Sequence, residues 1–136
     1  MTAPLLYRIA AALFVVFAAG HTFGFLKFKP ATAEGLAVRE AMDEVELHIG
    51  GRSYTYGGFY TGFGLYITVY LLFSALLSWH LANMALLDPQ AHGIIGWAFC
   101  AVQVAGLALS CVYFAPITAA LSGIVAICLG LAAWLT

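Results

Sequence analysis

Four long apolar segments, separated by shorter polar ones, make up most of the chain. They cover residues 4–26, 59–82, 92–114 and 117–135. Each is close to the ~20 residues that an α-helix needs to cross a hydrocarbon layer ~30 Å thick. The pattern predicts an all-α integral membrane protein: a single transmembrane domain over residues 1–136 that folds as a four-helix bundle.

The polar segment 27–58, between the first two spans, has a pattern of its own. Its apolar side chains recur at roughly helical spacing at Leu36, Val38, Met42, Val45 and Ile49. Thr32 is a suitable N-cap, so we expect a short amphipathic helix over about 32–48 on the membrane surface. We expect the glycine pair 50–51 to end this helix, and the pair 57–58 to turn the chain into the second span.

Composition and charge agree with a membrane location. The chain is 64% hydrophobic and 8% charged, whereas a soluble domain is ~25% charged. Nine of its eleven charged residues lie between Lys27 and Arg52, and the other two are Arg8 and Asp88. The net charge of −1 gives no reason to expect a nucleic-acid partner.

The first span has one competing interpretation. Arg8, the apolar residues 9–19 and the small residue Gly20 also fit a signal peptide with its cleavage site. A retained helix gives an even number of spans and a closed four-helix unit, so we expect the segment to remain.

Four spans place both termini on one side of the membrane and segment 27–58 on the other. That segment holds Lys27, Lys29, Arg39 and Arg52, against Arg8 on the terminal side. The excess of Lys and Arg predicts that the segment is cytoplasmic.

Small residues mark the faces on which the spans can pack. The fourth span repeats them at i+4 steps: Thr118, Ser122, Ala126 and Gly130. Gly20 and Gly24 in the first span, and Gly58 and Gly62 in the second, are similarly spaced. Lipid gives helices no hydrophobic reason to associate, so we expect these positions to allow close approach of neighbouring helices.

Polar side chains also occur inside the spans. Tyr66, Tyr70, Ser74 and Ser78 share one face of the second span, and Gln103 is near the middle of the third. Polar groups in hydrocarbon need partners, so these should face the bundle interior. Either they form hydrogen bonds that hold the helices together, or they line a ligand cavity.

His21 stands in an apolar run near the loop-side end of the first span. His80 lies near the opposite side, so the two histidines cannot share one metal ion or haem. Two interpretations of His21 stay open: a neutral ring bonded to a nearby carbonyl or tyrosine, or a functional group, since ionisable groups in a membrane are often functional.

The loop side supplies the possible partners of His21, which are Glu44, Glu46 and His48. Glu44 and His48 would be i,i+4 on the expected surface helix, a spacing that suits two ligands. No third ligand is evident, so we predict neither a metal site nor a cofactor. Cys100, Cys111 and Cys128 form no C-x-x-C pair and are expected to be packing residues.

Two sets of motifs resemble known proteins. Arg8, the apolar run, Gly20, His21 and Lys27 loosely resemble the first helix of DoxX-like four-helix membrane proteins, and the long first loop is similar. "GHTFGF" and "YGGFYTGFGLY" resemble more closely a set of uncharacterised small bacterial membrane proteins. The resemblance implies a DoxX-like bundle and no particular chemistry. Small multidrug exporters differ, because they rely on a carboxylate in the first span.

These observations lead to one functional expectation and one alternative. We expect a multi-pass protein of the bacterial inner membrane that binds an apolar or amphipathic ligand, a lipid or quinone. Its pocket would be lined by His21, Tyr66, Tyr70 and Gln103, with Glu46 and His48 near His21. If the protein is an enzyme, His21 is the candidate acid–base group. The alternative is a non-enzymatic accessory subunit of a larger membrane complex, or a homo-oligomer.

Overall fold

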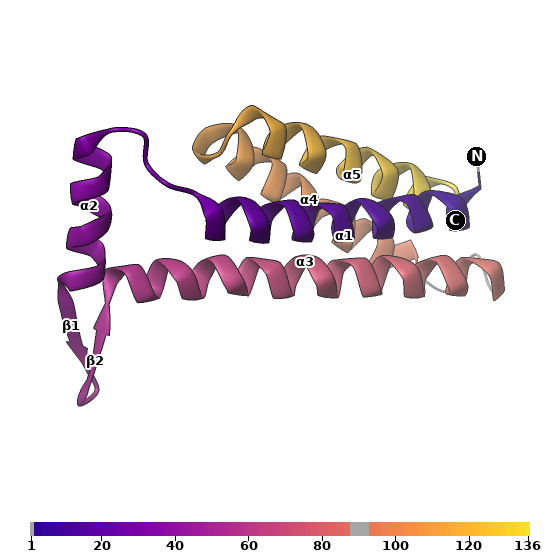
Figure 1. The fold of residues 1–136 in the computed structure, drawn as a ribbon. Helices are drawn as coiled ribbons and strands as arrows, with labels where there is room; N and C mark the ends of the chain where they lie inside the picture. The colour runs from indigo at the N-terminus through magenta and orange to yellow at the C-terminus, as the bar shows by residue number, and fades with distance from the viewer. Residues whose placement is uncertain (1, 88–92) are drawn as a thin grey trace. The chain divides into compact units, whose positions relative to one another are not determined.

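The computed structural model describes residues 2–87 and 93–136. Within them the chain forms five helices and one two-stranded hairpin (Figure 1). In chain order these are α1 (Ala3–Lys27), α2 (Ala33–Glu44), β1 (Glu46–Ile49), β2 (Arg52–Thr55), α3 (Tyr56–Leu87), α4 (Gly93–Tyr113) and α5 (Pro116–Trp134).

The four long helices α1, α3, α4 and α5 are apolar and long enough to cross a membrane, as predicted. Their ends differ from the expected bounds by a few residues. The largest difference is in α3, whose 32 residues extend for about 48 Å and so exceed the ~30 Å apolar layer. His92, the expected start of the third span, and Asp88 lie outside the described residues.

The expected surface helix is shorter than predicted. It begins after Thr32, whose side-chain oxygen accepts a hydrogen bond from the Gly35 N–H at 3.1 Å, and it ends at Glu44. Val45 is already extended, so Glu46 and His48 lie on a strand. The expectation of a helix to residue 48, with Glu44 and His48 on one helix face, was wrong.

A tight hairpin replaces the missing part of that helix. Ile49 pairs with Arg52 across a turn formed by Gly50 and Gly51, whose φ angles are +58° and +76°. Two successive positive φ angles are typical of a two-residue hairpin turn and favour glycine at both positions. The glycine pair therefore turns a strand and does not end a helix.

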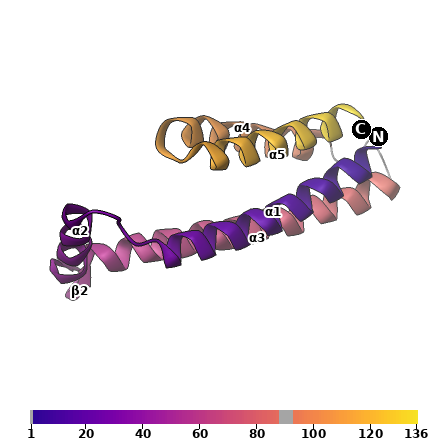
Figure 2. The same ribbon diagram turned by 45° about the horizontal axis from the view of Figure 1, so that its top comes forward.

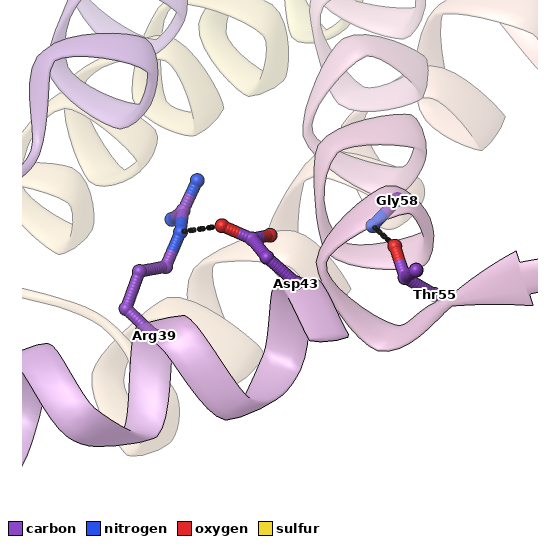
Figure 3. Close-up of polar contacts among 4 residues, drawn as sticks. All are labelled: Arg39, Asp43, Thr55 and Gly58. Carbon is purple, nitrogen blue, oxygen red and sulfur yellow. Dashed lines mark hydrogen bonds and ion pairs between the residues drawn. The ribbon is translucent and has the colours of Figure 1, made fainter. Parts of the chain in front are cut away.

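The start of α3 is capped by a side chain. The Gly58 N–H donates to Thr55 Oγ1 at 3.0 Å (Figure 3), so Gly57 and Gly58 lie inside the helix and do not form a separate turn. Arg39 and Asp43 form an ion pair at 3.6 Å on α2. The Arg39 guanidinium also lies 5.6 Å from the centre of the Tyr60 ring, which joins α2 to α3.

The chain divides into two compact units. The first, here called the helical unit, consists of residues 1–17 and 71–136, and the second, the hairpin unit, of residues 18–70. The prediction of a single transmembrane domain stays a prediction.

The helical unit contains the buried core. Its largest fully buried apolar side chains are those of Tyr7, Phe14, Leu6, Leu81, Leu129 and Val125. Helices α4 and α5 lie side by side (Figures 1 and 2), and Phe14 stacks on Phe99 of α4 with ring centres 5.6 Å apart.

Small residues account for the close approach of α4 and α5. Ser122 and Ala126 are buried, and a Cβ added to Gly130 would lie 3.3 Å from Cys100 Sγ. The expected packing face of the fourth span is therefore present. Gly20 and Gly24 belong to the hairpin unit, where no atom beyond their chain neighbours and their own helix backbone lies within 4 Å of the Cβ position at either residue. The close helix approach expected there stays a prediction.

The hairpin unit, every residue of which is described, has almost no buried interior. Only Ala18 and Gly57 are buried in it. Helix α2 and the hairpin lie at the start of α3 and run across its axis; α2 is on the side of α1 and the hairpin is on the other side (Figure 1). The apolar side chains of this unit therefore remain open to a membrane, a ligand or another chain.

Candidate functional site

His21 joins α1 to α3 through a backbone carbonyl. Its Nε2 lies 3.0 Å from the Gly64 oxygen. A carbonyl can only accept, so Nε2 carries a hydrogen and donates it. The ring also stacks on Phe25, with centres 5.5 Å apart, and has no second hydrogen-bond partner in the described part of the chain. His21 is thus held in one orientation, with Nδ1 left without a protein partner.

Gly64 is the position that permits this approach. A Cβ at residue 64 would lie 2.6–2.9 Å from atoms of the Phe25 ring. The same ring packs edge-on against Tyr60, with centres 6.1 Å apart. The absence of a side chain at Gly64 therefore lets the Phe25 ring lie directly on the backbone of α3.

Two threonines extend the contact by one turn. Thr22 Oγ1 and Thr68 Oγ1 are 2.7 Å apart, and Thr22 also donates to the Ala18 oxygen at 2.7 Å. Thr68 Oγ1 also lies 3.3 Å from the Gly64 oxygen, to which it can donate. Each hydroxyl has one hydrogen, so Thr68 donates either to Thr22, when Thr22 donates to Ala18, or to the Gly64 oxygen. His21, Thr22, Gly64 and Thr68 form a small polar cluster that pairs the two helices.

An open apolar groove lies on the other face of α3. Its volume is about 550 Å³. The lining residues are Ile49 and Tyr54 from the hairpin and Gly58, Phe59, Gly62, Phe63 and Tyr66 from α3. At 100° per residue, these α3 positions lie about opposite Gly57, Tyr60, Gly64 and Thr68. The hairpin groove, as we call it, and the His21 cluster are on opposite sides of one helix.

Aromatic rings form one wall of the hairpin groove. The rings of Tyr54 and Phe59 are 5.7 Å apart, and those of Phe59 and Phe63 are 6.3 Å apart. These contacts tie β2 to the first two turns of α3. The floor beside them is open, because no described atom beyond its chain neighbours and its own helix backbone lies within 4 Å of the Cβ position at Gly62.

The two faces of the hairpin differ in chemistry. Side chains alternate along a strand, and paired residues share a face. The strand register therefore places Leu47, Ile49, Arg52 and Tyr54 on the groove face. Glu46, His48, Ser53 and Thr55 are on the other.

Glu46 and His48, two of the predicted site residues, lie on that other face and bond locally. His48 Nδ1 is 2.9 Å from Ser53 Oγ, and His48 Nε2 is 4.0 Å from Glu46 Oε2. Both side chains are exposed. The structure therefore joins Glu46 to His48 but does not join either to His21 or to the hairpin groove.

The other predicted site residues also do not form one cluster with His21. Tyr66 lines the hairpin groove, and Tyr70 is one turn further along the same side of α3. Gln103 belongs to the helical unit, where its amide nitrogen donates to Ser122 Oγ at 2.8 Å. For Gln103, this bond fits the first of the two interpretations given above, in which the polar side chains of the spans form hydrogen bonds that hold the helices together.

The described residues contain no group of three or more His, Cys, Asp or Glu side chains placed to hold a metal ion. Cys100 and Cys128 are buried, and Cys111 is exposed on α4. None of the three cysteines forms a disulfide.

Sequence reasoning missed most of the hairpin groove. Val45 and Ile49 fit a helical stripe, but Leu47 and Ile49 alternate with Glu46 and His48 at the period of a strand. The decisive signal is the Gly50-Gly51 pair between two such four-residue runs. Once the hairpin is recognised, Phe59 and Phe63 follow as the α3 residues within its reach.

No protein-family model matches the chain, and no curated protein or solved structure matches it. The likeness to DoxX-like proteins rests on the sequence motifs alone.

Proposed function

We propose that this chain is a multi-pass protein of the bacterial inner membrane that binds a small amphipathic molecule with an apolar tail, a lipid or a quinone, in the hairpin groove. The observation that carries the proposal is the groove itself, formed by the hairpin and one face of α3. This location differs from the pocket beside His21 that the sequence suggested.

The size and lining of the hairpin groove suit such a molecule. Ligand pockets usually measure 300–1,000 Å³ and are mostly apolar with a few polar groups; this groove measures about 550 Å³. Its lining consists of apolar residues, two glycines and the tyrosines Tyr54 and Tyr66. The apolar lining suits an aliphatic tail, and tyrosine is the residue type in this lining that can hydrogen-bond a polar head group.

Charge at the hairpin supports an amphipathic ligand over a purely apolar one. Arg52 shares the groove face of the hairpin with Ile49 and Tyr54. Its exposed guanidinium can reach a carbonyl or phosphate oxygen outside the apolar part of the groove. A ligand with both a tail and an oxygen-bearing head would use both features.

The experiment compares two glycines that both have free space around them. Gly62 lines the hairpin groove and Gly20 does not. Apart from chain neighbours and the helix's own backbone, no described atom lies within 4 Å of either Cβ position. Gly62→Leu would occupy the groove, while Gly20→Leu is the matched control on α1. Leucine favours helix over glycine, so neither change should unfold the chain.

The readout is the ligand retained by detergent-purified protein, extracted with solvent and quantified by mass spectrometry. Wild type and Gly20→Leu should retain a stoichiometric molecule. Gly62→Leu should retain about tenfold less, as expected if it displaces two methylene groups at ~0.8 kcal/mol each. The extracted mass distinguishes an acyl lipid from a quinone.

Equal retention by Gly62→Leu and wild type would overturn the proposal. So would recovery of ligand-free protein in a larger complex in mild detergent, which is the result expected of an accessory subunit. The almost unburied hairpin unit would then be a surface for other chains.

A further inference from the structure

A second apolar cleft lies in the helical unit and has a cation at one end. Its volume is about 400 Å³. The lining consists of Arg8, Ala11, Ala12 and Val15 from α1 and Ala75, Leu76 and Trp79 from α3. Ala11 and Ala75 are buried and form the floor, while Val15, Leu76 and Trp79 stand up as exposed walls.

Arg8 is held at the mouth of this cleft. Its guanidinium carbon lies 5.3 Å from the centre of the Trp79 ring. A guanidinium that stacks on a ring keeps its in-plane N–H groups free for a bidentate bond to phosphate or carboxylate. Among the described residues, neither the Arg39–Asp43 ion pair nor the 4.0 Å contact of His48 with Glu46 includes Arg8.

The position of Arg8 along α1 gives the cleft a polar end and an apolar end. Trp is typical of the membrane–water interface, and a cation within a span extends towards that interface. From Arg8, the residues Ala11, Ala12 and Val15 continue along α1 for about 10 Å. A cation at head-group level and an alanine-floored channel leading away from it match a phospholipid with its phosphate at Arg8 and an acyl chain in the channel.

We propose that the Arg8–Trp79 cleft binds one phospholipid with a net negative head group. The phosphate accepts hydrogen bonds from the Arg8 guanidinium, and one acyl chain lies over Ala11 and Ala75 between Val15 and Leu76. The preference is for an anionic lipid because no described carboxylate pairs with Arg8 and the rest of the lining is uncharged. This site is separate from the hairpin groove.

The test is a titration of delipidated full-length protein with phosphatidylglycerol and with phosphatidylcholine of the same chains, followed by native mass spectrometry. Wild type should bind the first lipid more tightly. Arg8→Gln should weaken phosphatidylglycerol binding about tenfold, the loss expected for one charge-assisted hydrogen bond. Lys29→Gln removes a positive charge at an exposed position outside both the cleft and the hairpin groove, and should leave this binding unchanged.

A second variant tests the apolar part of the cleft without altering charge. Ala12→Phe fills the cleft and should weaken binding of phosphatidylglycerol, while Ala19→Phe, at an exposed position of α1 outside the cleft, should not. Equal affinity for the two lipids, or wild-type affinity in both Arg8→Gln and Ala12→Phe, would overturn the proposal. Loss of binding in the Lys29 or Ala19 control would do so as well.

Discussion

Glycine has different roles at neighbouring positions of α3. At Gly64 the missing side chain makes room for Phe25 and brings the backbone oxygen to His21. At Gly62, two residues away and facing the hairpin groove, the space is empty. The role of each glycine follows from what lies opposite it, which the spacing of glycines in the sequence does not reveal.

Gly64→Ala should therefore destabilise the protein, and Gly62→Ala should not. The Phe25 ring would have to move away from both His21 and Tyr60, and overpacking of this kind costs about 1–3 kcal/mol. Gly62→Ala should be neutral or stabilising by up to about 1 kcal/mol, because alanine favours helix. Unfolding of the two variants in mixed detergent micelles measures the difference.

A companion variant identifies the cause of the loss. Phe25→Leu in the Gly64→Ala background removes the ring that clashes, so it should recover part of the lost stability. No recovery, or equal stability of Gly62→Ala and Gly64→Ala, would show that the Phe25–Gly64 contact is not formed in the protein.

At the scale of elements, the long helices were predicted and the hairpin was missed. A run of about twenty apolar residues has few alternatives in a membrane, because every backbone group must be bonded within the segment. The segment Glu46–Ile49 is only four residues long, so the same apolar positions fit a helical or a strand period. The turn at Gly50 and Gly51 decides between them through its positive φ angles.

The residues of the candidate site could also be predicted only in part from the sequence. That Tyr66 and Tyr70 share a face of the second span was predictable from helical geometry. Which face of α3 meets His21 depends on how Phe25 packs on Gly64, and that contact joins residues far apart in the chain. The sequence therefore supplied Tyr66 but not Phe59, Phe63 or Ile49.

The hairpin turn offers a direct test of this element. Replacing Gly50-Gly51 by Ala-Ala puts two side chains in the left-handed region, at a cost of about 1–2 kcal/mol per residue. The matched variant Gly50→Asn keeps Gly51 and gives the Asn-Gly pair that such turns favour. Hydrogen exchange should be faster in β1 and β2 of the Ala-Ala variant and unchanged in Gly50→Asn.

A variant that loses the hairpin should also retain less ligand in the hairpin groove. Ile49 and Tyr54 supply the hairpin side of the groove, so the Ala-Ala variant should also lose bound ligand. Fast exchange in the hairpin with full ligand retention would show that α3 alone holds the molecule. Slow exchange in both variants would show that the strands do not depend on this turn.

At the scale of the whole molecule, four helices able to span a membrane imply a topology that labelling can measure. An even number of spans puts Thr2 and the C-terminal residue on one side and the hairpin on the other. The positively charged residues near the first loop, Lys27 and Lys29 among them, predict that the hairpin side is cytoplasmic.

Single cysteines at exposed positions test two of these expectations together: that Thr2 and the hairpin lie on opposite sides, and that the hairpin side is cytoplasmic. After Cys100, Cys111 and Cys128 are replaced by serine, Thr2→Cys and Ser53→Cys report the two sides. In spheroplasts, an impermeant maleimide should label Thr2→Cys, and it should label Ser53→Cys only after the membrane is opened. The reverse order of labelling would keep the four spans and invert the orientation. Labelling of both residues in closed spheroplasts would contradict the four-span topology, because α1 is the only span between Thr2 and Ser53 and must separate them if it crosses the membrane.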